Sequence, residues 1–121
     1  MDLHAWVVCK DGSVWDPHFA WYDHCKEVWG CAPDAPTLRE ELTGDAKKQA
    51  WREIWKRFLR PALEDAHDLA ELFRQQVDHP VPGRCFLNAW AFLQLNRGTA
   101  LMKIGKMGWA KKEGGVHWEY G

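Results

Sequence analysis

The sequence predicts a single α+β domain, in which a small antiparallel sheet formed by N- and C-terminal hairpins packs on a buried, cysteine-bearing helix. Three observations lead to this prediction. Apolar, β-rich segments occur near both ends of the chain, the segment between them follows helical spacing, and 121 residues suffice for one hydrophobic core. We expect the sheet in residues 1–17 and 99–121, a helical region over 37–78 and a central helix over 84–97.

The first hairpin is indicated by a turn signal between two short strands. Residues 3–9 are apolar and rich in strand formers. Asp11-Gly12 is a typical hairpin turn, the second strand follows over 14–15, and Pro17 ends it. The aromatic, irregular segment that comes next carries a short helix or turn near 22–28.

Capping patterns set the expected helix boundaries in the middle of the chain. Thr37 and Glu40 form a capping-box pattern, which predicts a short helix over 38–43 that ends at Gly44. A longer helix over 46–60 follows, because its apolar residues recur every three to four positions.

The longer helix has Asp45 as its expected N-cap. Pro61 is expected to break or kink the chain after it, since proline is tolerated mainly at the first position of a helix. A further helix then runs to about Val77.

The central helix is the most apolar segment of the chain. Arg84 to Gly98, "RCFLNAWAFLQLNRG", is apolar on nearly every face, which is typical of a helix buried on all sides. Gly98 is its expected C-cap. A strand over 99–109 and a final strand over 116–121 complete the sheet.

Composition excludes several classes of protein. The net charge is −1, which gives no general attraction to nucleic acids, and no apolar run is long enough for a membrane span. No signal-like segment begins the chain, so we expect a cytoplasmic protein whose four cysteines are free thiols. We expect no cofactor. A Cys25–Cys31 disulfide is the alternative for an exported protein.

Cys85 is the candidate nucleophile. It opens the most apolar helix, and the partial positive charge of a helix N-terminus favours a thiolate, so we expect its pKa to be lowered. The free N–H groups of the same turn can hold an oxyanion. The competing interpretation is a small, buried core residue, because free cysteine is among the most buried residue types.

A nucleophilic cysteine needs a base and a group that orients the base. His4 begins the first strand of the N-terminal hairpin and Asp16 ends the second. Because the hairpin is antiparallel, these two residues are expected to lie side by side.

The segments "GRCFLNAW" and "HAWVVCKDGSVWDP" resemble parts of the papain-like and transglutaminase-like cysteine fold. In that family a cysteine opens a buried helix, a histidine opens a neighbouring strand and an aspartate follows on the next strand. The usual order is Cys, His, Asp, whereas here it is His4, Asp16, Cys85, so the sequence looks circularly permuted. The resemblance implies a cysteine hydrolase or acyltransferase with a peptide or protein substrate, and covers about 25 residues.

A second base is available in the unpermuted order. His117 opens the last strand, and Glu119 follows on the same face. We favour His4, because its carboxylate comes from a separate, adjacent strand. Asn88 lies one turn into the helix from Cys85, where it either supports the site or serves as a buried structural amide.

Two other functions compete with the enzyme. One is a non-enzymatic binding protein of phage or mobile-element type, in which Cys85 is buried and exposed aromatic residues contact a partner or a second copy of the chain. The other is a metal-stabilised fold, because several ligand types cluster near the N-terminus, although their spacing fits no zinc knuckle. These residues are Asp16, His18, His24, Cys25 and Cys31.

The helix over 46–60 carries a basic stripe at i, i+4 spacing, and acidic residues of the following helix are expected to pair with it. The stripe consists of Lys48, Arg52, Lys56 and Arg60, and the acidic candidates are Glu64, Asp65, Asp68 and Glu71. The alternative, an anion or nucleic-acid contact, is less favoured. Trp51 and Trp55 on the same helix are interpreted as core or dimer-surface residues.

Overall fold

A computed structural model describes residues 3–17, 37–81, 83–111 and 113–118 of the chain. The predicted segment near 22–28 lies outside these residues. The described elements are β1 (His4–Cys9), β2 (Val14–Trp15), β3 (Thr37–Glu41), α2 (Gly44–Ile54), the π-helix η1 (Trp55–Leu59), α3 (Arg60–Asp65), α4 (Leu69–Asp78), α5 (Cys85–Leu95), β4 (Ala100–Ala110) and β5 (Val116–Trp118). The predicted α+β class is confirmed.

Strand β4 is the centre of the antiparallel sheet. It pairs with β1 over residues 100–105, with β3 over 105–109 and with β5 over 108–110. Because β3 and β5 both pair with residues 108 and 109, they lie on opposite edges of β4, and β5 shares the edge of β1. The two ends of the chain therefore meet on one strand, as the sequence predicts.

The N-terminal hairpin forms as expected. Val7 pairs with Trp15, and the Cys9 N–H donates to the Ser13 carbonyl at 2.8 Å. Gly12 sits at the turn with φ +88°, a conformation that only glycine adopts without strain. The Asp11 side chain accepts from the N–H of Ser13, which closes the turn.

The helix predicted over 38–43 is wrong, because this segment is β3. Its backbone groups pair with β4, and Leu42 extends the pairing by donating its N–H to the Ile104 carbonyl at 2.9 Å. Pairing with a buried central strand outweighs a local capping pattern. Gly44 consequently begins α2 instead of ending a helix, with Thr43 rather than Asp45 at the N-cap position.

The helix predicted over 46–60 is present as α2 and η1, and it continues through Pro61 into α3. Proline lacks an N–H, and its ring crowds the carbonyl four residues earlier in an α-helix. The wider π-turn of η1 directly precedes Pro61, and it accommodates the proline without ending the helix.

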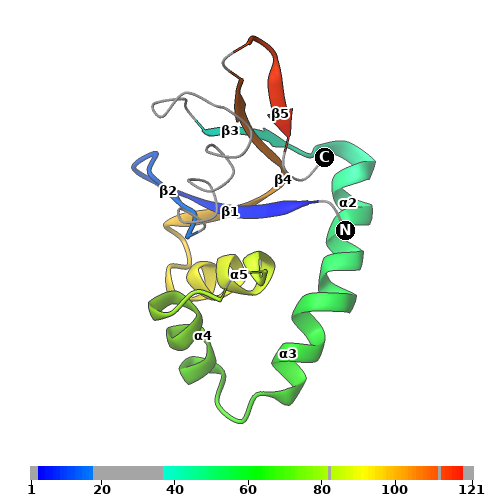
Figure 1. Ribbon diagram of the computed structural model, residues 1–121. Helices are drawn as coiled ribbons and strands as arrows, with labels where there is room; N and C mark the ends of the chain where they lie inside the picture. Colours follow the sequence, from blue (N-terminus) through cyan, green and yellow to red (C-terminus); the bar gives the residue numbers. More distant parts are fainter. Residues whose placement is uncertain (1–2, 18–36, 82, 112, 119–121) are drawn as a thin grey trace.

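The helix predicted to run to Val77 is interrupted at residues 66–68. Ala66 is extended, and the Asp68 carboxylate caps α4 by accepting the N–H of Glu71 at 3.1 Å. Figure 1 shows the reason for the break: α3 and α4 lie on opposite flanks of α5, so the chain must turn between them.

Helix α5 lies beneath β1 and forms the centre of the core (Figure 1). Its first five residues are buried, and Trp15 stacks on Phe92 with ring centroids 4.6 Å apart. The helix ends at Leu95, and Gly98 adopts φ +83° in the following turn instead of capping the helix directly.

The two tryptophans of the long helix meet α5 at Trp90. Trp51 and Trp55 both approach Trp90 edge-on, at 6.4 and 5.8 Å between ring centroids. Trp51 packs against the core, whereas Trp55 is 43% exposed.

The basic stripe is only partly paired by the expected acidic residues. Arg60 bonds Glu64 at 3.0 Å, but Glu71 bonds Arg74 on its own helix and Asp68 caps α4. Lys48, Arg52 and Lys56 form no ion pair with any residue in the described ranges. Within the same ranges, no helix has the length and apolar content of a membrane span.

Gly105→Ala should destabilise the protein by about 3 kcal/mol, because the new methyl group would clash with backbone atoms that cannot move aside. A Cβ at this position would lie 1.9 Å from the Glu40 carbonyl oxygen. Urea unfolding would measure the loss, with the exposed Leu101→Ala on the same strand as control. A loss no larger than that of the control would show that β3 does not approach β4 as closely as described.

Candidate active site

His4 and Asp16 form a buried pair at the open end of the N-terminal hairpin. The His4 Nε2 and the Asp16 Oδ2 are 2.8 Å apart, and the two residues are 0% and 2% exposed. Asp16 follows directly after β2 and stands diagonally across from His4, which is within reach of two side chains on one face. The predicted proximity of the two residues is confirmed.

Arg39 is a third member of this cluster, which the sequence did not reveal. Its Nη2 and Nε donate to the same Asp16 Oδ2, at 3.1 and 3.3 Å. Arg39 belongs to β3, on the far edge of β4 from β1. Because that segment carries a capping-box pattern, the sequence predicted a helix there and gave no reason to place Arg39 near Asp16.

The contacts of Asp16 define the chemistry of His4. A buried carboxylate that accepts from a guanidinium is stable as the anion, because its charge is compensated. An ionised carboxylate only accepts hydrogen bonds, so the His4 Nε2 carries the hydrogen.

The thiol of Cys85 lies against β1 at the residue that follows His4. Ala5 pairs with Ile104 of β4, and the Ile104 carbonyl accepts from Leu42 on the β3 side of β4. In an antiparallel pair the two partners point their backbone groups in opposite directions here, so the Ala5 N–H points away from β4, toward the β2 edge. Strand β2 pairs there with Val7 and Val8. The Ala5 N–H instead hydrogen-bonds the Cys85 sulfur, which places the thiol at the edge of β1.

The expected lowering of the Cys85 pKa is wrong. Burial raises the pKa of the thiol to about 11, and the negative charge of Asp16 acts in the same direction. Hydrogen bonds from the N–H groups of Ala5, Phe86 and Cys85 itself lower the pKa, but they do not outweigh burial. Cys85 is 8% exposed, so the helix N-terminus acts on a largely dehydrated sulfur.

Asn88 is a buried structural amide. Its Nδ2 donates to the Val81 carbonyl at 3.1 Å, and its Oδ1 accepts the Val81 N–H at 3.4 Å. These bonds fix the loop that leads into α5. Asn88 therefore supports the position of Cys85 through the backbone before it.

The structure does not bring the alternative base to Cys85. His117 is paired with Trp109, whereas Ala5, at the thiol, is paired with Ile104. Five residues of β4 correspond to about 17 Å. The His117 ring packs on Trp109 with centroids 4.9 Å apart, and Glu119 lies outside the described residues.

The predicted metal ligands are not placed as a set. Asp16 is described, and its Oδ2 bonds His4 and Arg39. The other four, His18, His24, Cys25 and Cys31, lie outside the described residues. Among the residues that are described, no three His, Cys, Asp or Glu side chains form a group able to hold a metal ion.

Comparison of the chain with protein-family models, curated proteins and solved structures finds no match in any of the three. Cys85, His4, Asp16 and Arg39, the Cys85 cluster, are the residues whose geometry bears on function.

The free energy of unfolding should fall as the pH rises above about 9, and ionisation of Cys85 should cause part of this fall. The folded protein holds the thiol at a pKa of about 11 against 9.0 in the unfolded chain, so the protonated thiol favours folding. This contribution is complete below pH 9 and is lost toward pH 11, by about 3 kcal/mol in all. Urea unfolding from about pH 8 to about pH 11 should show a steeper loss for wild type than for Cys85→Ala. Parallel pH curves would contradict the raised pKa.

Asp16→Asn should destabilise the protein by about 3 kcal/mol, because it leaves the buried His4 and the partly buried Arg39 without a charged acceptor. Asp78→Asn, an exposed carboxylate change at the end of α4, is the matched control and should change stability by at most about 0.5 kcal/mol. Thermal unfolding of both variants measures the difference. Equal effects would mean that the Asp16 contacts carry no net stabilisation.

Proposed function

We propose that this protein is a thiol-dependent acyl-transfer enzyme, a cysteine hydrolase or acyltransferase, with Cys85 as nucleophile and His4 as base. One observation carries the proposal: the imidazole is bonded to a buried carboxylate, and the N–H of the next residue bonds the thiol. Asp16 orients His4, and Arg39 is a positioning residue that holds Asp16.

The proposed reaction gives each of these groups a role. The Cys85 thiol transfers its proton to the His4 imidazole as the sulfur attacks an amide or thioester carbonyl carbon. The carbonyl oxygen becomes an oxyanion, and N–H groups of the first turn of α5 stabilise it. Collapse of the intermediate breaks the bond to the leaving amine or thiol, which takes the proton from His4, and leaves an acyl-thioester on Cys85. Water or an acceptor amine then releases the acyl group.

The raised pKa of Cys85 determines how the nucleophile forms. With a pKa of about 11, only about one thiol in 10⁴ is ionised at pH 7. The resting enzyme therefore holds a neutral thiol, and the proton moves to His4 during attack rather than before it. Substrate binding supplies the geometry for that transfer.

The resemblance to papain-like and transglutaminase-like enzymes supports the same assignment. The His-Ala-Trp and Asp-Pro pairs supply the base and its orienting carboxylate, and the cysteine opens a buried helix. We propose that the protein is a cytoplasmic, circularly permuted member of that group and that it acts on a peptide or protein.

A second candidate is a non-enzymatic binding domain of phage or mobile-element type, in which Cys85 only packs the core. The observation that favours it is the burial of Cys85, which is 8% exposed with a pKa of about 11. Exposed apolar side chains such as Leu101 and Leu95 would then contact a partner or a second copy of the chain.

Treatment with p-nitrophenyl acetate should test the two functions. An acyl-transfer enzyme releases nitrophenolate in a burst and gains one acetyl group on Cys85, which peptide mass spectrometry locates. His4→Ala should slow the burst by about 100-fold or more, because general-base assistance is typically worth that factor. His117→Ala, a histidine change away from the Cys85 cluster, should retain the burst.

Acetylation of Cys85 that persists unchanged in His4→Ala would refute the role of His4. Modification of Cys85 only in urea would refute the enzyme and favour the binding domain. Cys9, which is half-buried, serves as the internal reference for access of the reagent to a folded thiol.

A further inference from the structure

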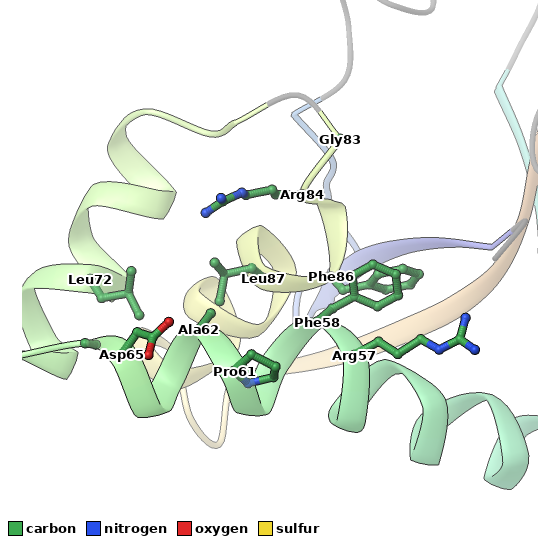
Figure 2. Close-up of a pocket in the computed structure, with 11 residues that line it drawn as sticks. Arg57, Phe58, Pro61, Ala62, Asp65, Leu72, Gly83, Arg84, Phe86 and Leu87 are labelled. Carbon is green, nitrogen blue, oxygen red and sulfur yellow. The ribbon is translucent and has the colours of Figure 1, made fainter.

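A groove lies on the flank of α5 that faces away from the sheet, beside the residues on either side of Cys85. Its volume is about 490 Å³, within the usual range of small-molecule sites. Figure 2 shows the groove between α3 and the start of α5, with Leu72 of α4 at its far side. The Cys85 cluster does not line it.

The floor of the groove is apolar and partly aromatic. Phe58 of η1 and Phe86 of α5 are in contact, with ring centroids 5.1 Å apart, and Phe58 is 38% exposed. Pro61, Leu72 and Leu87 continue this surface. An aromatic or branched apolar group fits such a floor.

The walls carry charges that are not neutralised by one another. Arg84 and Asp65 line the groove from opposite sides, and neither has an ion-pair partner within the described part of the chain (Figure 2). Arg57, the other cation of the groove, is bonded to Glu53 at 3.0 Å. Arg84 is therefore the cation available to a ligand, and a guanidinium suits a carboxylate.

We propose that this groove is a binding site for an apolar monocarboxylate, such as the C-terminal end of a short apolar peptide. The apolar group packs on Phe58 and Phe86, and Arg84 binds the carboxylate. Asp65 on the other wall disfavours a second negative charge and accepts a hydrogen bond from a ligand N–H. The π-helix that supplies Phe58 is consistent with this role, since π-turns are frequent at functional sites.

Methyl NMR titration tests the site with two matched probes, N-acetyl-L-phenylalanine and its neutral amide. The acid should shift the methyl signals of Ala62, Leu72 and Leu87 and should bind about fivefold more tightly than the amide. Arg84→Gln should abolish that preference, whereas Arg97→Gln, an exposed arginine at the other end of α5, should retain it.

Ala62→Phe, which fills the groove, should prevent binding of both probes. Cys85→Ala should bind the acid as wild type does, because the site does not depend on thiol chemistry, and failure of the acyl-transfer proposal would leave this result unchanged. Equal binding of acid and amide, a preference that survives Arg84→Gln, or no shift at about ten millimolar acid would each overturn the proposal.

Discussion

The buried carboxylate of Asp16 is the interaction on which the rest of the structure depends. It accepts hydrogen bonds from His4 on β1 and from Arg39 on β3, two strands that lie on opposite sides of β4. A charge without water requires such compensation, so the hairpin, the central strand and β3 must be in place together. The same contacts set the hydrogen on the His4 Nε2, so the ion pairs that join the strands also fix the orientation of the His4 ring.

Strand β4 determines where these partners meet. It pairs with three other strands; β1 and β3 both pair with Gly105, and the missing side chain of Gly105 lets β3 approach closely. The N-terminal hairpin and the C-terminal strands, about 100 residues apart in sequence, become neighbours through this one strand. The sheet thereby brings segments from both ends of the chain together.

The start of α5 combines two opposing effects on one sulfur. The helix N-terminus and the Ala5 N–H favour a thiolate, whereas burial under β1 and the nearby Asp16 charge favour the thiol. Burial dominates in the resting protein. The groove on the other flank of α5 meets the same turn through Arg84 and Phe86, so a ligand there would bind next to Cys85 without touching it.

The sequence by itself determined the α+β class, the N-terminal hairpin, the buried helix over 84–97 and the proximity of His4 to Asp16, because each follows from local spacing, turn chemistry or continuous apolar character. Tertiary structure alone decided that 37–41 is a strand, that Arg39 joins Asp16 and that the pKa of Cys85 is raised. Strand pairing, long-range ion pairs and dehydration depend on contacts between distant segments, and a local sequence pattern does not predict which segments will pack together.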